Sequence, residues 1–283
     1  MREATGVRGI GEGIMMVRRY LPAILILVIL LFLDRPGAAH ARSSVLFDQG
    51  HGQKFLVERG GDLDLSLLAG IFRELGHDVT TSSEALSDAL LKNVDVLMIS
   101  GPFKPYAGDE IEAVVRYLQR GGALCITLHI ASPVSSLIYR LGLDVSNGVI
   151  HEEEGNILGD SLNFRVTHME EHPLLAGVGE FNLYGVWALL DLRPGVRTIA
   201  RTSPKAWVDL NRNNRFDGAD ARGPFGVVVA GEKGKGRFVV TGDDAVFQNR
   251  YLQGGNLALA RNLAAWLAAP VWTPDKEVGG EKR

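Results

Sequence analysis

The fold is decided by one stretch of the sequence, which reads Val94-Asp95-Val96-Leu97-Met98-Ile99-Ser100. The stretch is almost continuously apolar, which is typical of a strand covered on both faces of a parallel sheet. Gly101-Pro102 ends it, and residues 108–119 follow with apolar side chains at helical spacing. A second apolar run, residues 123–129, comes after Gly121-Gly122. This order predicts a strand–helix–strand unit with parallel strands.

The same alternation extends outward along the chain in both directions. Further strands are predicted at residues 44–48, 78–81, 225–230 and 237–241. Further helices are predicted at residues 63–75, 84–91, 134–141 and 256–267. The last two strands are separated by a turn rich in glycine and lysine, which is typical of a hairpin. The sequence therefore predicts an α/β fold, a flavodoxin-like three-layer sandwich with a mostly parallel sheet.

The regular alternation stops between residues 145 and 224. This part is rich in glycine, asparagine and acidic residues, and it has too few apolar residues to form a core of its own. We interpret it as an irregular insertion before the last strands of a single domain that spans residues 42–270. Residues 271–283 are polar after Pro270, and we expect a flexible tail there.

The first 41 residues have the pattern of an export signal. Arg18-Arg19 precede an apolar run at residues 21–33, and Ala39-His40-Ala41 is a small-residue cleavage site. The apolar run is shorter than the roughly 20 residues that a membrane-spanning helix needs. We expect cleavage near Ala41 and a periplasmic or extracellular protein. The alternative is that residues 21–33 are retained and hold the chain at the membrane.

The composition of the chain limits which functions and partners are expected. The chain has 283 residues, of which 46% are hydrophobic and 22% charged, and its net charge is -3. No basic stripe is present, so no nucleic-acid partner is expected. The single cysteine, Cys125, excludes an internal disulfide and lies in an apolar run, where we expect a buried side chain.

Polar residues follow the predicted strands where each one ends. Because ligands bind outside the carboxyl ends of parallel strands, we expect these residues to form a polar cleft. The predicted cleft consists of Asp48, Gln49, His51, Ser100, His129, Asp243, Asp244 and Asn249. Its histidines and carboxylates are able to bind a metal or transfer protons. Strand ends are also polar simply because they meet water, and that interpretation stays open.

Residues 209–220 have the register of a calcium-binding loop. Oxygen side chains fall at loop positions 1, 3, 5, 9 and 12, and the backbone carbonyl of position 7 completes the pattern. The predicted ligands are Asp209, Asn211, Asn213, Arg215, Asp217 and Asp220. Asn214 stands at position 6, where a positive φ is needed. We expect a structural Ca²⁺ site, and the alternative is a surface turn rich in asparagine and aspartate.

Four segments together resemble the class I glutamine amidotransferase-like superfamily, and within it the bacterial branch called domain of unknown function 4350. These segments are Asp48-Gln49-Gly50-His51, residues 94–102, residues 167–174 and residues 236–244. The branch is similar to the domain shared by gliding-motility and intraflagellar-transport proteins. The resemblance covers about residues 44–268, and it implies the same α/β fold and a role in binding or scaffolding.

The catalytic part of the resemblance is incomplete. Active amidotransferases place a cysteine on the sharp turn after a strand, with histidine and glutamate as partners. The matching turn here contains His129 and Ser132, and Cys125 comes too early. We therefore expect a binding or scaffold module whose partner is a small molecule, a glycan or an envelope protein. The alternatives are a hydrolase that uses His129, His51 or Ser132, and a membrane-anchored transporter accessory.

Overall fold

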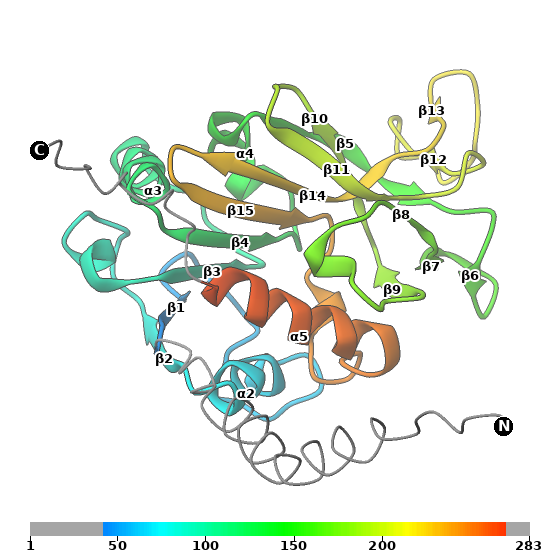
Figure 1. Cartoon of the computed structure of the whole chain (residues 1–283). Helices are drawn as coiled ribbons and strands as arrows, with labels where there is room; N and C mark the ends of the chain where they lie inside the picture. The colour runs from blue at the N-terminus through cyan, green and yellow to red at the C-terminus, as the bar shows by residue number, and fades with distance from the viewer. Residues whose placement is uncertain (1–41, 270–283) are drawn as a thin grey trace, which may run out of the picture. The chain divides into compact units, whose positions relative to one another are not determined.

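A computed structural model describes residues 42–269 of the chain (Figure 1). The expected export signal, its cleavage site and the expected tail at residues 271–283 lie outside the described residues. No helix within residues 42–269 has the length and apolar character that crossing a membrane requires.

A parallel sheet forms the centre of the domain. Its strands are β1 (Ser44–Asp48), β2 (Asp78–Ser82), β3 (Val96–Ser100), β4 (Ala123–Thr127) and β15 (Gly236–Thr241). They lie in the order β15-β4-β3-β1-β2, and each neighbouring pair is parallel. Ser100, Thr127 and Thr241 are paired in register, so these strands end at the same edge of the sheet.

Helices cover both faces of this sheet. One face packs against α2 (Ser66–Glu74) and α5 (Gly254–Ala268), and the other against α3 (Gly108–Gln119) and α4 (Ser135–Leu141) (Figure 1). The packing of strand β3 explains why its sequence is almost continuously apolar. Val96 and Met98 lie in the core beneath α2 and α5, whereas Leu97 and Ile99 lie in the core beneath α3 and α4. Burial on both faces requires apolar residues at successive positions.

The predicted α/β fold is confirmed, and the sheet proves to be mixed. The predicted hairpin is present, because β14 (Gly226–Lys233) pairs antiparallel with β15. Beyond β14 the sheet continues with strands from the insertion. These are β5 (Leu143–His151), β8 (His168–Met169), β10 (Trp187–Asp191), β11 (Val196–Arg201), β12 (Trp207–Val208) and β13 (Ala221–Arg222).

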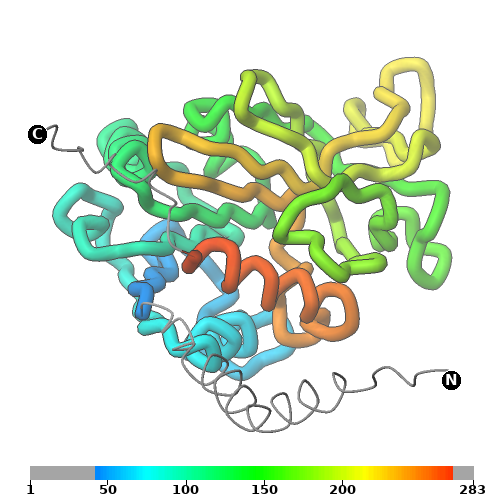
Figure 2. The backbone as a smooth tube through the Cα atoms, viewed as in Figure 1, coloured from blue at the N-terminus to red at the C-terminus, as the bar shows by residue number. Residues whose placement is uncertain are grey.

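The insertion is more regular than the sequence suggests. A second, three-stranded sheet is formed by β6 (Asn156–Ile157), β7 (Asp160–Val166) and β9 (Phe181–Tyr184). The backbone trace in Figure 2 shows the insertion, green to yellow, beside the hairpin. Phe164 and Phe181 join the same apolar core as α5, so the insertion shares the core of the main domain. Its strands are short and are stabilised by pairing with distant strands, which a local pattern does not reveal.

The predicted helix at residues 84–91 is wrong. That segment consists of turns followed by a short 3-10 helix, η1 (Leu90–Asn93). Side chains accept two backbone amides of this segment: the Glu84 amide donates to the Ser82 hydroxyl, and the Leu86 amide donates to the Glu110 carboxylate. These local and tertiary hydrogen bonds hold the segment in a non-helical conformation. Three other 3-10 helices are η2 (Ser132–Val134), η3 (Pro173–Leu175) and η4 (Ala245–Phe247).

Candidate functional site

Asp48 ends β1 and is the centre of a buried polar network. Its Oδ2 atom accepts hydrogen bonds from Gln53 Nε2 at 2.7 Å and from the Tyr106 hydroxyl at 2.5 Å. The same oxygen lies 2.8 Å from His51 Nδ1. On the other side of the ring, His51 Nε2 lies 3.0 Å from Oε1 of Glu110 in α3. We call Asp48, His51, Gln53, Tyr106 and Glu110 the His51 network.

His51 is the basic side chain of this network and lies between the carboxylates of Asp48 and Glu110. Burial of the ring opposes its charged form, but hydrogen bonds and Coulomb attraction from Asp48 and Glu110 outweigh burial and raise the pKa of His51. The Tyr106 ring stacks on the imidazole with centroids 3.7 Å apart. Burial next to Asp48 raises the pKa of the Tyr106 hydroxyl, so it stays a donor. The ring nitrogens of His51 are both occupied, and the network leaves no open position for a ligand.

The His51 network holds together three segments that are distant in sequence. Glu110 Oε1 accepts the Leu86 amide, and Oε2 accepts the Ala107 amide at the start of α3. The backbone carbonyl of His51 accepts the amides of Phe103 and Lys104, each at 2.9 Å. The loops that follow β1 and β3 are therefore fixed to each other and to α3.

The second polar pair at this edge is His129 with Asp244. His129 Nδ1 lies 3.2 Å from Asp244 Oδ1, and the side chain of His129 is 39% exposed whereas that of Asp244 is 3% exposed. The hydrogen bond to Asp244 raises the pKa of His129 despite partial burial of the ring. Burial raises the pKa of Asp244, and the contact with His129 only partly opposes this. The buried carboxylate of Asp244 thus orients the exposed imidazole of His129.

Asp244 Oδ2 is buried and has no hydrogen-bond partner within residues 42–269. It lies over Gly101, where a Cβ atom would come within 2.5 Å of this oxygen. Gly101 has a φ of 53°, so glycine is required there by both the backbone and the space. The following residue, Pro102, has no amide to donate to the carboxylate.

The remaining residues of the predicted cleft have other contacts. Gln49 donates to Glu58, and the hydroxyl of Ser100 is hydrogen bonded to that of Thr127. Asp243 accepts the amides of Tyr184 and Ala245, and its burial raises its pKa well above the usual value. Asn249 accepts the Leu67 amide at the start of α2 and donates to Gly61. The structure thus groups Asp48 with His51, and His129 with Asp244, and separates the others.

The turn after β4 differs from a nucleophile elbow. None of residues 128–132 has a positive φ, so the strained backbone of such an elbow is not formed in this described segment. Ser132 is exposed at the start of η2, and no hydrogen bond joins its hydroxyl to His129 in the described part of the chain. Cys125 is fully buried in β4, and burial raises the pKa of its thiol.

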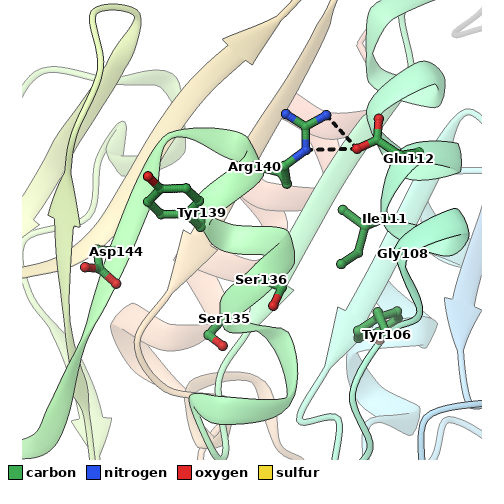
Figure 3. Close-up of a pocket in the computed structure, with 9 residues that line it drawn as sticks. All are labelled: Tyr106, Gly108, Ile111, Glu112, Ser135, Ser136, Tyr139, Arg140 and Asp144. Carbon is green, nitrogen blue, oxygen red and sulfur yellow. Dashed lines mark hydrogen bonds and ion pairs between the residues drawn. The ribbon is translucent and has the colours of Figure 1, made fainter.

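A groove of about 630 Å³ lies between α3 and α4 (Figure 3). Figure 3 shows Arg140 of α4 directed at Glu112 of α3, with an Nη2–Oε1 distance of 2.6 Å. Tyr106 lines the groove while its hydroxyl donates to Asp48, so the groove borders the His51 network. Its volume is within the range of about 300–1,000 Å³ of small-molecule sites. The sequence analysis missed it because its lining comes from two helix surfaces without a motif.

The predicted calcium loop is held by its own side chains. Asp209 accepts the amides of Asn213 and Asn214, and Asn214 has a φ of 56°. The side-chain Nδ2 groups of Asn211 and Asn213 donate to the Asp217 carboxylate. Hydrogen bonds from the Ala219 amide and these asparagines hold the pKa of Asp217 below its usual value. Asp220 accepts the amides of Leu210 and Asp217.

A metal site in this loop would depend on more than carboxylates. In the described part of the chain, no three His, Cys, Asp or Glu side chains form a group able to hold a metal. Asn211, Asn213 and the backbone carbonyl of Arg215 are oxygen ligands of the kind that Ca²⁺ accepts. The asparagine amides that now face Asp217 would have to turn for their oxygens to face a cation.

Several residues around His129 were missed by the sequence analysis. The Phe55 and Phe103 rings lie 5.2 Å and 5.1 Å from the His129 ring, between centroids. Trp187 Nε1 donates to the backbone carbonyl of His129 at 3.2 Å. The pairs Lys54-Phe55 and Phe103-Lys104, which follow two strand ends, were the available signal. Trp187 belongs to the insertion and had no such signal.

We predict that His51 makes stability depend on pH. Replacing it with glutamine leaves Asp48 and Glu110 buried without their cation, and we expect the free energy of unfolding to fall by roughly 3 kcal/mol at pH 6. Because the folded-state pKa is raised, the contribution of the charge is complete below the unfolded value of about 6.5 and is lost as the pH rises through the folded-state pKa. Urea denaturation between pH 6 and pH 9 measures both effects.

The matched control is His168→Gln, which changes an exposed histidine and should leave the pH dependence as it is. The raised pKa of His129 adds a slope of the same sign, so His51→Gln should reduce the slope without abolishing it. An unchanged slope in His51→Gln would show that His51 is neutral in the folded protein.

Comparison with solved structures supports the fold. The mmIFT52 N-terminal domain is 16% identical over 82% of this chain and 100% of its own length, with a TM-score of 0.64. A cytoplasmic protein from Salmonella typhimurium LT2 is 14% identical over 79% of this chain and 98% of its own, with a TM-score of 0.52.

The sequence comparisons settle the family. No curated protein matches the chain. The family model described as domain of unknown function (DUF4350) matches residues 65–264, which include α2, the parallel sheet from β2 onward, the insertion and most of α5. The resemblance drawn from the strand-end motifs is thereby confirmed. The chain belongs to the DUF4350 family.

Proposed function

We propose that this protein is a non-catalytic binding or scaffold module of the cell envelope. The observation that carries the proposal is the turn after β4, where an amidotransferase would hold its nucleophile. Here His129 and Ile130 occupy the turn in ordinary backbone conformations, and the only cysteine of the chain is buried in β4. The resemblance to a domain that serves binding in transport assemblies supports the same function.

The His51 network supports a binding role because it fixes the loops at the sheet edge. Fixed loops present their side chains without the entropy cost of ordering them when a partner binds. Lys54 and Phe103 project from these loops and are at least partly exposed. The partner is a small molecule, a glycan or an envelope protein.

A hydrolase is the second candidate, and the His129–Asp244 pair is the observation that favours it. A buried carboxylate that orients an exposed imidazole is the arrangement of a general base. A water molecule or a substrate hydroxyl at His129 Nε2 would be its target, and Ser132, three residues later in the chain, is an exposed hydroxyl.

Turnover and covalent labelling separate these two functions. We expect no hydrolysis of a panel of esters, amides and glycosides, and no acyl or fluorophosphonate adduct by intact mass. Iodoacetamide should modify Cys125 only after unfolding, because the folded protein excludes the reagent. A rate that disappears in His129→Gln, or an adduct at Ser132, would replace the binding function with the hydrolytic one.

Export is part of the proposal. Residues 1–41 have the three parts of a signal peptide, and the α/β domain begins directly after them with β1. We expect the exported protein to begin at Arg42, which intact mass spectrometry of periplasmic and membrane fractions measures. A membrane-bound form that retains residues 21–33 would instead favour the transporter accessory.

We also propose that residues 209–220 bind Ca²⁺ as a structural ion. The oxygen side chains in register and the positive φ of Asn214 at loop position 6 support the site. A cation would neutralise Asp209, Asp217 and Asp220 and would hold the loop against β5 through β12. With a dissociation constant on the order of 10⁻⁴ M, the binding would suit an extracellular setting.

Calcium should therefore stabilise the protein. At 10 mM Ca²⁺ we expect about 2.7 kcal/mol of added stability, seen as a higher thermal midpoint that EGTA reverses. Asp209→Ala and Asp217→Ala should remove this response, whereas Asp144→Ala, an exposed aspartate outside the loop, should keep it. A midpoint that does not move in the wild type, or a response that survives both loop variants, would end the proposal.

A further inference from the structure

Three basic side chains extend from loops at the carboxyl edge of the parallel sheet. They come from different loops: Lys54 after β1, Lys104 after β3 and His129 after β4. Phe103 lies next to Lys54 and His129 and directly precedes Lys104 in the chain. Its ring lies 5.1 Å from the His129 ring between centroids, and 6.0 Å from Lys54 Nζ. We call Lys54, Lys104 and His129 the cationic edge.

His129 offers a directed hydrogen bond at this edge. Its Nδ1 atom is engaged by Asp244, and within residues 42–269 no protein group is hydrogen bonded to Nε2. Because Asp244 is buried and close, it favours the protonated ring, so that Nε2 presents an N–H. The neighbouring Phe55 and Phe103 rings restrict the directions in which the imidazole can turn.

The two lysines add charge that the protein does not neutralise. In the described part of the chain, neither Lys54 nor Lys104 forms an ion pair, and both are exposed. Lys104 is placed by its backbone amide, which donates to the His51 carbonyl, and its side-chain carbons lie along Gly52. The loops that hold these ammonium groups are therefore fixed while the groups themselves remain available.

The acidic residues next to the cationic edge are already used inside the protein. Asp48 accepts hydrogen bonds within the His51 network, and Asp243 accepts two backbone amides. Asp244 contacts Nδ1 of His129, and each of the three carboxylates is almost fully buried. These three carboxylates therefore add no exposed negative charge beside the cationic edge.

We propose that the cationic edge binds the anionic group of a ligand, a carboxylate or a phosphate. The N–H at His129 Nε2 donates to an oxygen of the anion, and the two ammonium groups complete the charge. The Phe55 and Phe103 rings offer an apolar surface to the adjoining part of the ligand. This assignment rests on the proposed binding function and names the chemistry of its ligand.

The test uses benzoate and phenyl phosphate as probes, with benzamide as a neutral match for the ring. We expect the Cε1–H proton resonance of His129 in the full-length protein to shift saturably with at least one anion. Tighter binding of benzoate would indicate a carboxylate ligand, and tighter binding of phenyl phosphate would indicate a phosphate ligand. Benzamide should bind at least about tenfold more weakly, because it lacks the charge.

Variants assign the binding to these side chains. We expect two variants to weaken anion binding by about tenfold each, as measured by calorimetry. One is the single variant His129→Gln, and the other is the double variant that combines Lys54→Gln with Lys104→Gln. Lys92→Gln removes an exposed lysine at the opposite end of β3 and should change nothing. Circular dichroism and the thermal midpoint check that each variant is folded.

Three results would overturn the assignment: no saturation with either anion, equal binding of benzamide, or equal weakening by Lys92→Gln. If the anions fail to bind and turnover is also absent, only the anion assignment is lost and the binding function stands. If phenyl phosphate binds and is hydrolysed, the anion assignment stands and the non-catalytic function is lost.

Discussion

The imidazole of His51 lies between the buried carboxylates of Asp48 and Glu110, and the sheet edge depends on this arrangement. Two buried carboxylates without a cation would be costly, so they raise the pKa of the ring and fix its orientation. The same residue accepts the amides of Phe103 and Lys104 through its backbone carbonyl. One buried ion triad therefore joins the loops after β1 and β3 to the start of α3.

This arrangement explains why polar residues at the sheet edge divide into two kinds. Asp48, Asp243 and Asp244 are buried and receive hydrogen bonds from the protein, whereas His129, Lys54 and Lys104 point their polar groups outward. Asp244 thus orients His129, and the network around Asp48 fixes the loops that carry Lys54 and Lys104. A surface that presents cations on fixed loops is suited to binding, and the relaxed turn at His129 lacks the strain of a nucleophile elbow.

The insertion completes the same edge. Trp187 at the start of β10 donates to the His129 carbonyl, and the Tyr184 amide donates to Asp243. Strands of the insertion are stabilised by pairing with β14 and by packing on α5. Residues 145–224 therefore extend the main sheet and take part in shaping the site.

The sequence by itself determined the parallel core, because a strand such as Val96–Ser100, which is apolar at four successive positions, needs a cover on both faces. It also determined the residues that follow the strands, and hence which of them could share an edge. Tertiary structure alone decided which residues contact each other. Glu110 reaches His51 from a helix, Lys54 lies over Phe103, and Glu110 accepts the Leu86 amide. Such contacts join side chains that are far apart in the chain, and their burial, which sets charge and hydrogen bonding, exists only once the layers have packed.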